Sequence, residues 1–179
     1  MRAIDLLISD EFHRAAPGGS GGVKAIGNYA PGMMPSKLAK AQGYAEIIYL
    51  DAKTSTYVEE VGAANFFCIK DGVLYTPELT GTILPGITRD SIIALARHMG
   101  YEVVEEKVSA EFAMSADEAF CCGTAAVISP IGSITHADMK VTYGDGTPGT
   151  ITKALYDKLT GIQNETEDDM FGWLHEVPL

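Results

Sequence analysis

The chain has 179 residues, of which 46% are hydrophobic and 21% are charged. This length suits a single domain that can bury a hydrophobic core without disulfides or bound metal. The net charge is −11 and Lys and Arg form no cluster, so we expect neither nucleic acid nor an anionic membrane surface as a partner. No apolar run approaches the roughly 20 residues that span a bilayer, and the N-terminus is too charged for a signal peptide. The composition therefore predicts a cytoplasmic domain.

Three cysteines, Cys68, Cys121 and Cys122, are an odd number and show no CxxC spacing. This pattern disfavours a disulfide framework and favours a reducing compartment. We expect Cys121 and Cys122 to lie in the core, as free cysteines usually do. The four histidines are scattered singly without ligand spacing, so no metal site is predicted.

Hydrophobic periodicity and turn residues predict a chain of short alternating elements. The strongest turn signal is Asp71-Gly72, which predicts a hairpin, and Gly100 is expected to end the clearest helix. Phe171 and Trp173 are expected to pack back on the body. The predicted elements are helix 36–42, strands 46–51, 57–60, 65–70 and 73–77, helix 88–99, strand 102–108, helix 110–114, strands 119–122 and 127–131, and helix 150–163. Mixed strands with hairpins favour the α+β class over a doubly wound parallel sheet.

The first candidate functional residue is Lys24, which follows the glycine-rich stretch PGGSGG. Most lysines are solvated surface residues, but glycines that let the backbone approach a ligand make this one a better candidate amine nucleophile. A nucleotide-binding loop is rejected, because no Ser or Thr follows the lysine and the glycine spacing differs from GxxxxGK[ST].

Two further segments could bind an anion. The sequence LPGITRD, residues 84–90, leads into a predicted helix; it is either a plain N-terminus capped by Thr88 or Asp90 or a phosphate cradle in which Gly86 permits close approach. The turn GTAA, residues 123–126, is either tight packing or a place where backbone amides and the Thr124 hydroxyl surround an anion.

Glu59 and Glu60 end a predicted strand. Neighbouring side chains in a strand point to opposite faces, so one of the two is expected to point inward and to need a partner there. The commoner alternative is that both carboxylates are solvated.

Six segments in this order resemble the C-terminal, large domain of branched-chain amino acid aminotransferases, which are pyridoxal-phosphate enzymes of fold type IV. The segments are GGVKAIGNY, YLD…YVEEVGAANFF, KDGVLYTP, GTILPGITRDSI, EAFCCGTAAVISPI and LTGIQNETEDDMFGWL. The resemblance implies an α+β fold in which mixed sheets form a pseudo-barrel with flanking helices. It covers residues 1–179, and the family's smaller N-terminal domain is expected to be missing from this chain.

The resemblance also implies roles for individual residues. Lys24 would form the Schiff base with the cofactor aldehyde and then move a proton as a free amine. Tyr29 would hydrogen-bond the ring's phenolic oxygen, and Glu60 would pair with the pyridine nitrogen. Leu84, Gly86, Ile87, Thr88 and Thr124 would hold the cofactor and its phosphate, and Thr124 and Ala125 would meet the substrate carboxylate.

The implied reaction is transamination of Leu, Ile and Val with 2-oxoglutarate by a protein that forms a homo-oligomer, as a dimer. Without the smaller domain, we expect the isolated chain to be impaired and to leave an apolar face bare. The alternatives are another fold type IV enzyme (a D-amino acid aminotransferase or aminodeoxychorismate lyase), a non-catalytic dimerisation or cofactor-binding module, and an unrelated anion-binding protein. Ala126 and Ser129 stand where some relatives have a redox CxxC pair, so no thiol switch is predicted.

Overall fold

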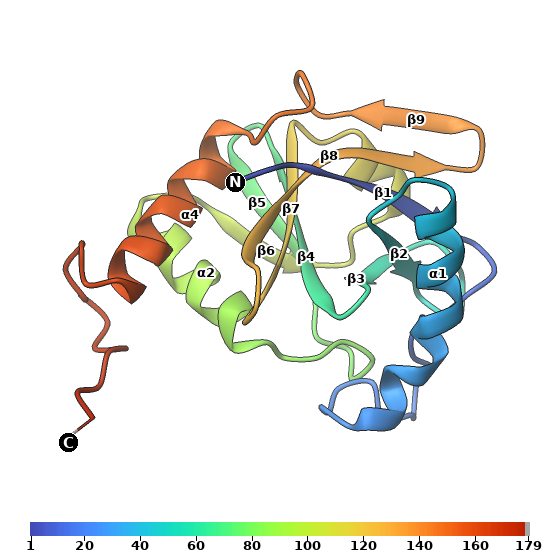
Figure 1. Cartoon of the computed structure of the whole chain (residues 1–179), viewed down its shortest axis with the longest axis horizontal. Helices are drawn as coiled ribbons and strands as arrows, with labels where there is room; N and C mark the ends of the chain where they lie inside the picture. The colour runs from blue at the N-terminus through green and yellow to red at the C-terminus, as the bar shows by residue number, and fades with distance from the viewer. Residues whose placement is uncertain (178–179) are drawn as a thin grey trace.

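The computed structural model describes residues 1–177 and contains one mixed β-sheet that closes on itself (Figure 1). Six strands form the closed ring in the order β3-β2-β1-β8-β7-β4, because β3 also pairs with β4. Beyond β4 the sheet continues through β5 and β6, and β9 pairs with β8. The strands are β1 (Ile4–Ser9), β2 (Glu46–Leu50), β3 (Val58–Val61), β4 (Ala64–Lys70), β5 (Val73–Pro77), β6 (Val103–Glu106), β7 (Glu118–Gly123), β8 (Val127–His136) and β9 (Met139–Thr142).

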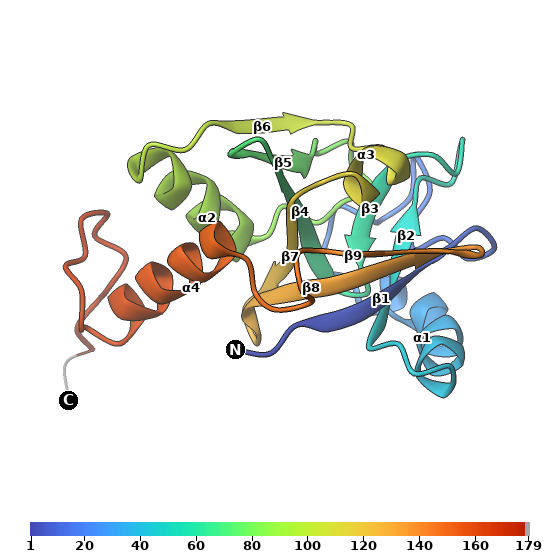
Figure 2. The same cartoon turned by 90° about the horizontal axis from the view of Figure 1, so that it is seen from above.

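Helices lie on two sides of this barrel. The helix α1 (Met33–Ala41) packs beside β2, whereas α2 (Ile87–His98) and α4 (Thr150–Gln163) lie together on the opposite side (Figures 1 and 2). The short helix α3 (Ala110–Met114) is capped at its start by Ser109, whose hydroxyl accepts from the Phe112 amide at 3.0 Å. Two short 3-10 turns, Ile26–Asn28 and Ala30–Gly32, lead into α1.

Alternation along the strands separates a core inside the barrel from two clusters outside it, the smaller of which joins Ile47 and Tyr49 of β2 to Ala39 of α1. Side chains of one parity, among them Leu6, Ile48 and Phe66, fill the inside of the barrel together with residues of α3. Side chains of the other parity, such as Phe67 and Phe120, form a second cluster with the apolar faces of α2 and α4. This separation follows from the two-residue period of a strand, and it makes the barrel wall apolar on both faces.

The sequence predictions for the regular elements are mostly confirmed. Helices α3 and α4 have the predicted bounds, and Asp71 and Gly72 both adopt positive φ (52° and 79°), as a type I′ hairpin turn requires. Phe171 and Trp173 stack on each other at 4.2 Å and pack against the cluster under α2 and α4. The mixed α+β class and the barrel are confirmed as well.

Three features were not predicted. Strands β1 and β9 were missed, and β8 extends to His136, five residues past its predicted end. The segment of β1 (IDLLIS) lies in the ring between β2 and β8, both of which pair with it in parallel, so its pairing is set by segments far away in the sequence. No helix among residues 1–177 is long and apolar enough to cross a membrane.

Candidate active site

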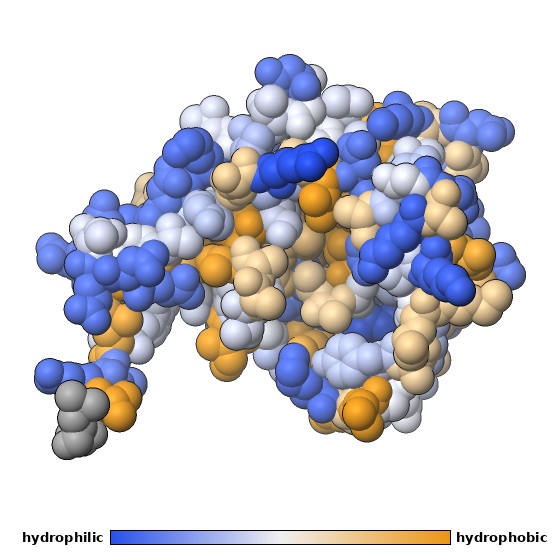
Figure 3. Space-filling view, viewed as in Figure 1, coloured by the Kyte–Doolittle hydropathy of each residue, from blue (hydrophilic) through white to orange (hydrophobic). Residues whose placement is uncertain are grey.

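A cavity of about 650 Å³ opens at one end of the barrel and gathers the predicted site residues from three distant segments. The glycine-rich loop contributes Lys24, the start of α2 contributes residues 84–88, and the turn between β7 and β8 contributes residues 123–126. Apolar residues lie around a hollow between α1 and the pair of α2 and α4 (Figure 3). Of the predicted residues, Lys24, Leu84, Gly86, Ile87, Thr88, Thr124 and Ala125 line this cavity.

Tyr29 and Glu60 do not line the main cavity directly. The Lys24 ammonium lies 5.9 Å from the centre of the Tyr29 ring, and Tyr29 lines a smaller adjoining hollow that shares Glu46 and Ala63 with the cavity. Glu60 lies behind Asn65, which lines the cavity and donates from Nδ2 to Glu60 Oε1 at 3.2 Å.

The loop that carries Lys24 is held by Asn28. The Asn28 amide nitrogen donates to the carbonyls of Ser20 and Val23, both at 2.7 Å, and its oxygen accepts from the Ser20 hydroxyl at 2.6 Å. These three bonds close the loop across Lys24, which is itself exposed and forms no ion pair among the described residues. Lys24 is therefore positioned by its backbone, with its amine free to react.

The glycines before Lys24 have a different role from the one expected. A Cβ at Gly21 would lie under 3.0 Å from the Thr82 carbonyl oxygen, and a Cβ at Gly22 would lie 2.9 Å from that of Gly81. These two glycines let the loop pack against the chain's own segment 81–82, and not against a ligand. The expectation of ligand approach was therefore wrong for Gly21 and Gly22.

Glu60 is a buried carboxylate, with 1% of its surface exposed. Arg14 Nη1 lies 2.6 Å from Glu60 Oε2, yet Oε2 accepts no aligned hydrogen bond. Burial raises the pKa of Glu60 from 4.5 to about 7, although the Arg14 charge works in the opposite direction. The site thus holds a desolvated carboxylate with capacity left for a further donor.

Glu59 is buried too, at 6% exposure. It accepts from the Thr82 hydroxyl at 2.5 Å, and burial raises its pKa above the usual range. The expectation that only one of the two glutamates would be inward was therefore wrong, as was the alternative that both would be solvated. Glu59 meets Thr82, which lies 23 residues further along the chain, and a local reading of the strand could not foresee this contact.

The start of α2 carries no side-chain cap. Helix α2 begins at Ile87 with Gly86 as its N-cap residue, so neither Thr88 nor Asp90 caps it as expected. The first backbone amide to bond within the helix is that of Asp90, to the Gly86 carbonyl at 3.1 Å. The amides of residues 87–89 remain without helical partners at the cavity wall, which is the usual arrangement for binding an anion.

Gly86 is required for a contact within the protein. A Cβ there would lie under 3.0 Å from Asn65 Oδ1, and Asn65 in turn donates to the Leu84 carbonyl at 2.9 Å. Gly86 thus lets β4 hold the segment before α2 at the cavity.

The turn after β7 exposes Thr124 and Ala125 at the opposite side of the cavity. The cysteines before it are buried as predicted, and burial raises the pKa of Cys121 to about 12. These thiols therefore stay protonated at neutral pH. No group of three or more potential metal ligands occurs among residues 1–177.

Arg14 and Asn65 are the site residues that sequence reasoning missed. Arg14 is 7% exposed and joins three segments, because it pairs with Glu60 and donates to the Thr82 carbonyl at 2.9 Å and to the Gly21 carbonyl at 3.4 Å. The available signal for Asn65 was a lone amide within an otherwise apolar strand, which needs a partner when buried. Arg14 carried no such signal.

The sequence of this barrel matches one family. Residues 2–134 match the family model described as amino-transferase class IV, and the chain belongs to that family.

Its relatives include branched-chain aminotransferases. The chain is 50% identical over 170 residues, 95% of its length, to the chloroplastic branched-chain-amino-acid aminotransferase 3 of Arabidopsis thaliana, of which it covers 41%. It is 44% identical to a probable branched-chain-amino-acid aminotransferase of Staphylococcus epidermidis over 99% of its own length and 51% of that protein. The chain therefore spans about half the length of the curated relatives it matches.

Solved structures agree with this assignment. The branched-chain amino acid aminotransferase of Escherichia coli superposes with a TM-score of 0.87 at 40% identity, over 97% of this chain and 55% of that one. The enzyme of Thermobaculum terrenum, solved in its PLP form, gives a TM-score of 0.83 at 33% identity, over 92% of this chain and 52% of that one.

Proposed function

We propose that this chain forms the cofactor-binding part of a pyridoxal-phosphate-dependent transaminase that acts on Leu, Ile and Val with 2-oxoglutarate as acceptor. The observation that carries the proposal is the pairing of a free amine with a desolvated acid at one cavity. Lys24 lines the cavity from a glycine-rich loop, and Glu60 lies buried behind Asn65 with an oxygen that lacks an aligned donor.

The residues present fit pyridoxal phosphate. Glu60 is a buried carboxylate paired with Arg14 at 2.6 Å, and a buried acceptor of this kind suits the N–H of a protonated pyridine ring. The unpaired amides at residues 87–89 and the hydroxyls of Thr88 and Thr124 suit a phosphate. The cavity of about 650 Å³ is large enough for a cofactor together with a small substrate.

When bound, pyridoxal phosphate supplies an aldehyde and an electron-accepting ring. Glu60 holds a proton at the ring nitrogen, and Arg14 and Asn65 fix the position of that carboxylate. The Lys24 amine, which lines the cavity, would attach the cofactor and carry a proton at the substrate Cα. Tyr29, whose ring lies beside Lys24, would hold the phenolic oxygen of the ring, and Leu84, Gly86 and Ile87, which line the cavity, would form the wall next to the phosphate.

The substrate class is supported by the names of the relatives. Those in Arabidopsis thaliana and Staphylococcus epidermidis are named branched-chain aminotransferases. In this chain Thr124 and Ala125 are exposed residues that line the cavity, where their backbone amides would bind the substrate carboxylate.

We also propose that the protein forms a homodimer in the cytoplasm. Large apolar side chains are exposed on the Lys24 loop and on α1, among them Ile26 at 90% and Met33 at 74%, and Ile87 is 78% exposed at the start of α2. Large apolar side chains exposed in this way favour an association site. Sedimentation velocity of the purified chain tests this, and a monomer at all concentrations contradicts it.

The proposed activity is tested by measuring 2-oxo acid formation. The chain is assayed with pyridoxal phosphate and 2-oxoglutarate, alone and with the N-terminal domain of a relative added separately. L-leucine, L-isoleucine and L-valine are the expected donors, with D-alanine as the comparison. Turnover of the branched-chain donors supports the proposal. Faster turnover of D-alanine than of these donors overturns it, as does the absence of turnover of any donor in both mixtures.

A further inference from the structure

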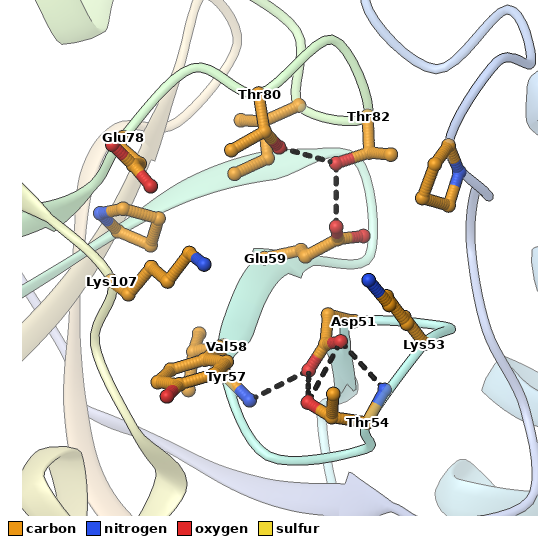
Figure 4. A pocket seen from close by; sticks show the side chains of 13 residues that line it. Asp51, Lys53, Thr54, Tyr57, Val58, Glu59, Glu78, Thr80, Thr82 and Lys107 are labelled. Carbon is orange, nitrogen blue, oxygen red and sulfur yellow. Dashed lines mark hydrogen bonds between the residues drawn. The ribbon is translucent and has the colours of Figure 1, made fainter.

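A second pocket, of about 320 Å³, is lined by Val58 and Glu59 of β3 and does not include Glu60 (Figure 4). It is bounded by the turn between β2 and β3, by the segment after β5 and by the residue after β6. Its lining residues do not include Lys24, Thr88 or Thr124, so it is separate from the proposed cofactor cavity, and a ligand there does not depend on the proposed transamination.

Glu59 is the chemical centre of this pocket. Its side chain is 6% exposed, points into the pocket and accepts from the Thr82 hydroxyl through Oε1 at 2.5 Å (Figure 4). Its other oxygen, Oε2, is buried without any hydrogen-bond partner. A buried carboxylate oxygen left without a partner costs free energy, and a ligand that donates to it would remove this cost.

Two lysines line the same pocket, and their ammonium groups have no ion-pair partner within residues 1–177. Lys53 and Lys107 point toward the space around Glu59 (Figure 4). Neither forms an ion pair or a hydrogen bond within residues 1–177, and the Lys107 ammonium lies over the Tyr57 ring at 5.4 Å. A neighbouring carboxylate, Asp51, is already committed, since it accepts from the backbone amides of Thr54, Thr56 and Tyr57.

The remaining wall is part apolar and part polar. Pro17, Tyr57, Val58, Pro77 and Ile83 form its apolar part, and Thr54, Glu78 and Thr80 its polar part. The pocket thus combines three carboxylates, of which only Glu59 is buried with an oxygen lacking a partner, with two ammonium groups and an apolar surface, in a space that suits a small metabolite.

We infer that this pocket binds a small zwitterion, namely an α-amino acid with an apolar side chain. The ligand ammonium would donate to Glu59 Oε2, the ligand carboxylate would contact Lys53 and Lys107, and the apolar side chain would pack on Val58, Pro77 and Ile83. A simple anion would meet the Glu59 carboxylate, and a simple amine would meet two lysines, so the mixed charge favours a ligand that carries both signs.

The test is isothermal titration calorimetry of the cofactor-free full chain with L-leucine. Two analogues each lack one charge: 4-methylpentanoate has no amine, and 3-methylbutylamine has no carboxylate. We expect L-leucine to bind, and each analogue to bind at least about tenfold more weakly, because each loses one charge-assisted contact.

Variants locate the binding. Glu59→Gln is expected to weaken L-leucine binding about tenfold or more, and Lys107→Met several-fold. The matched substitutions Glu11→Gln and Lys37→Met, at exposed positions outside the pocket, are expected to leave binding unchanged. Thr124→Val, in the cofactor cavity, shows whether L-leucine binds there instead. Lys107 is exposed, so its variant gives a result even if the buried Glu59→Gln substitution impairs folding.

Three results would overturn the inference. The first is no binding of L-leucine by the wild-type chain. The second is binding that Thr124→Val removes while Glu59→Gln and Lys107→Met leave it intact, which would place the ligand in the other cavity. The third is equal affinity for 4-methylpentanoate and L-leucine, which would mean that no ammonium is recognised.

Discussion

Lys24 and Glu60 serve one proposed site but are held in place by different means. Glu60 lies in β3, whose neighbours β2 and β4 pair with it on both sides, and it is clamped by Arg14 and Asn65. Lys24 lies in an irregular loop whose main restraints are the three hydrogen bonds of Asn28. The acid is fully buried, whereas the amine is exposed.

This difference suits the proposed chemistry. A carboxylate that holds one proton at a fixed point gains from a rigid, desolvated position. An amine that first bonds a carbonyl carbon and later moves a proton between two atoms has to change position. Four sets of variants test whether Glu60 is held rigidly and whether Lys24 is held only by its loop.

The largest expected effect is that of Lys24→Ala on transamination. Loss of the amine removes both the attachment point and the proton carrier, so we expect turnover to fall by at least about 10²–10⁴-fold. Turnover is measured by 2-oxo acid formation, with Lys37→Ala on α1 as the control. Because Lys24 is exposed, the unfolding midpoint should stay unchanged, and retained turnover would contradict the assignment.

Arg14→Met should cost the most stability. It leaves the buried Glu60 carboxylate without its counter-charge, which typically costs about 3–5 kcal/mol, and it also removes the bond to the Thr82 carbonyl. The free energy of unfolding in urea measures this cost.

The matched control is Arg97→Met, because Arg97 is an exposed arginine that pairs with Glu105 at 3.3 Å. An exposed pair contributes less than about 1 kcal/mol. Equal costs for the two variants would mean that Arg14 does not clamp the site.

Glu60 should give stability an unusual dependence on pH. Burial raises its pKa from 4.5 to about 7, so the folded state favours the protonated acid more than the unfolded state does. The contribution of Glu60 is therefore complete below its unfolded pKa and is lost as the pH rises through about 7.

We accordingly expect the free energy of unfolding of the wild-type chain to fall relative to that of Glu60→Gln by about 1–3 kcal/mol between about pH 5 and pH 8. Urea unfolding of both proteins across this range measures the difference. A parallel pH dependence of the two proteins would show that Glu60 is not desolvated.

The smallest effect is expected for Asn28→Ala. The three hydrogen bonds of Asn28 are local, so the global free energy of unfolding should change by about 1 kcal/mol or less. Amide hydrogen exchange in the peptide that contains Lys24 should nevertheless become faster. The control is Asn164→Ala, because Asn164 bonds only the Thr160 carbonyl at the end of α4; equal exchange in both variants would mean that Asn28 does not hold the loop.

The sequence predicted the elements that depend on local signals. Helix α4 and the Asp71-Gly72 hairpin follow from periodicity and turn chemistry within a few residues. Strand β1 could not be recognised in this way, because its position in the barrel is set by pairing with β2 and β8, whose partner residues lie 40 or more positions away, as in Leu6 with Glu46. The pairing of β3 with β4 closes the ring. In the sequence it looks the same as an ordinary hairpin, so it does not reveal that the sheet closes.

The same distinction between local signals and distant contacts applies to the residues of the candidate site. The residues that carry the chemistry, such as Lys24 and Thr88, were found through motifs that resemble a family. The residues that support them were missed or misread: Arg14 meets Glu60 across 46 positions of sequence, and Glu59 is buried by the segment that includes Thr82. Burial and charge pairing of this kind depend on the tertiary fold and leave no local pattern.

The most direct test of the account is reductive trapping. The chain is incubated with pyridoxal phosphate and reduced with borohydride, and the modified peptide is mapped by mass spectrometry, with Lys24→Ala as the blank. The account predicts modification concentrated on Lys24, with the other lysines unlabelled and the variant blank. Labelling scattered over the surface lysines, or no labelling, would contradict the claim that this cavity binds the cofactor.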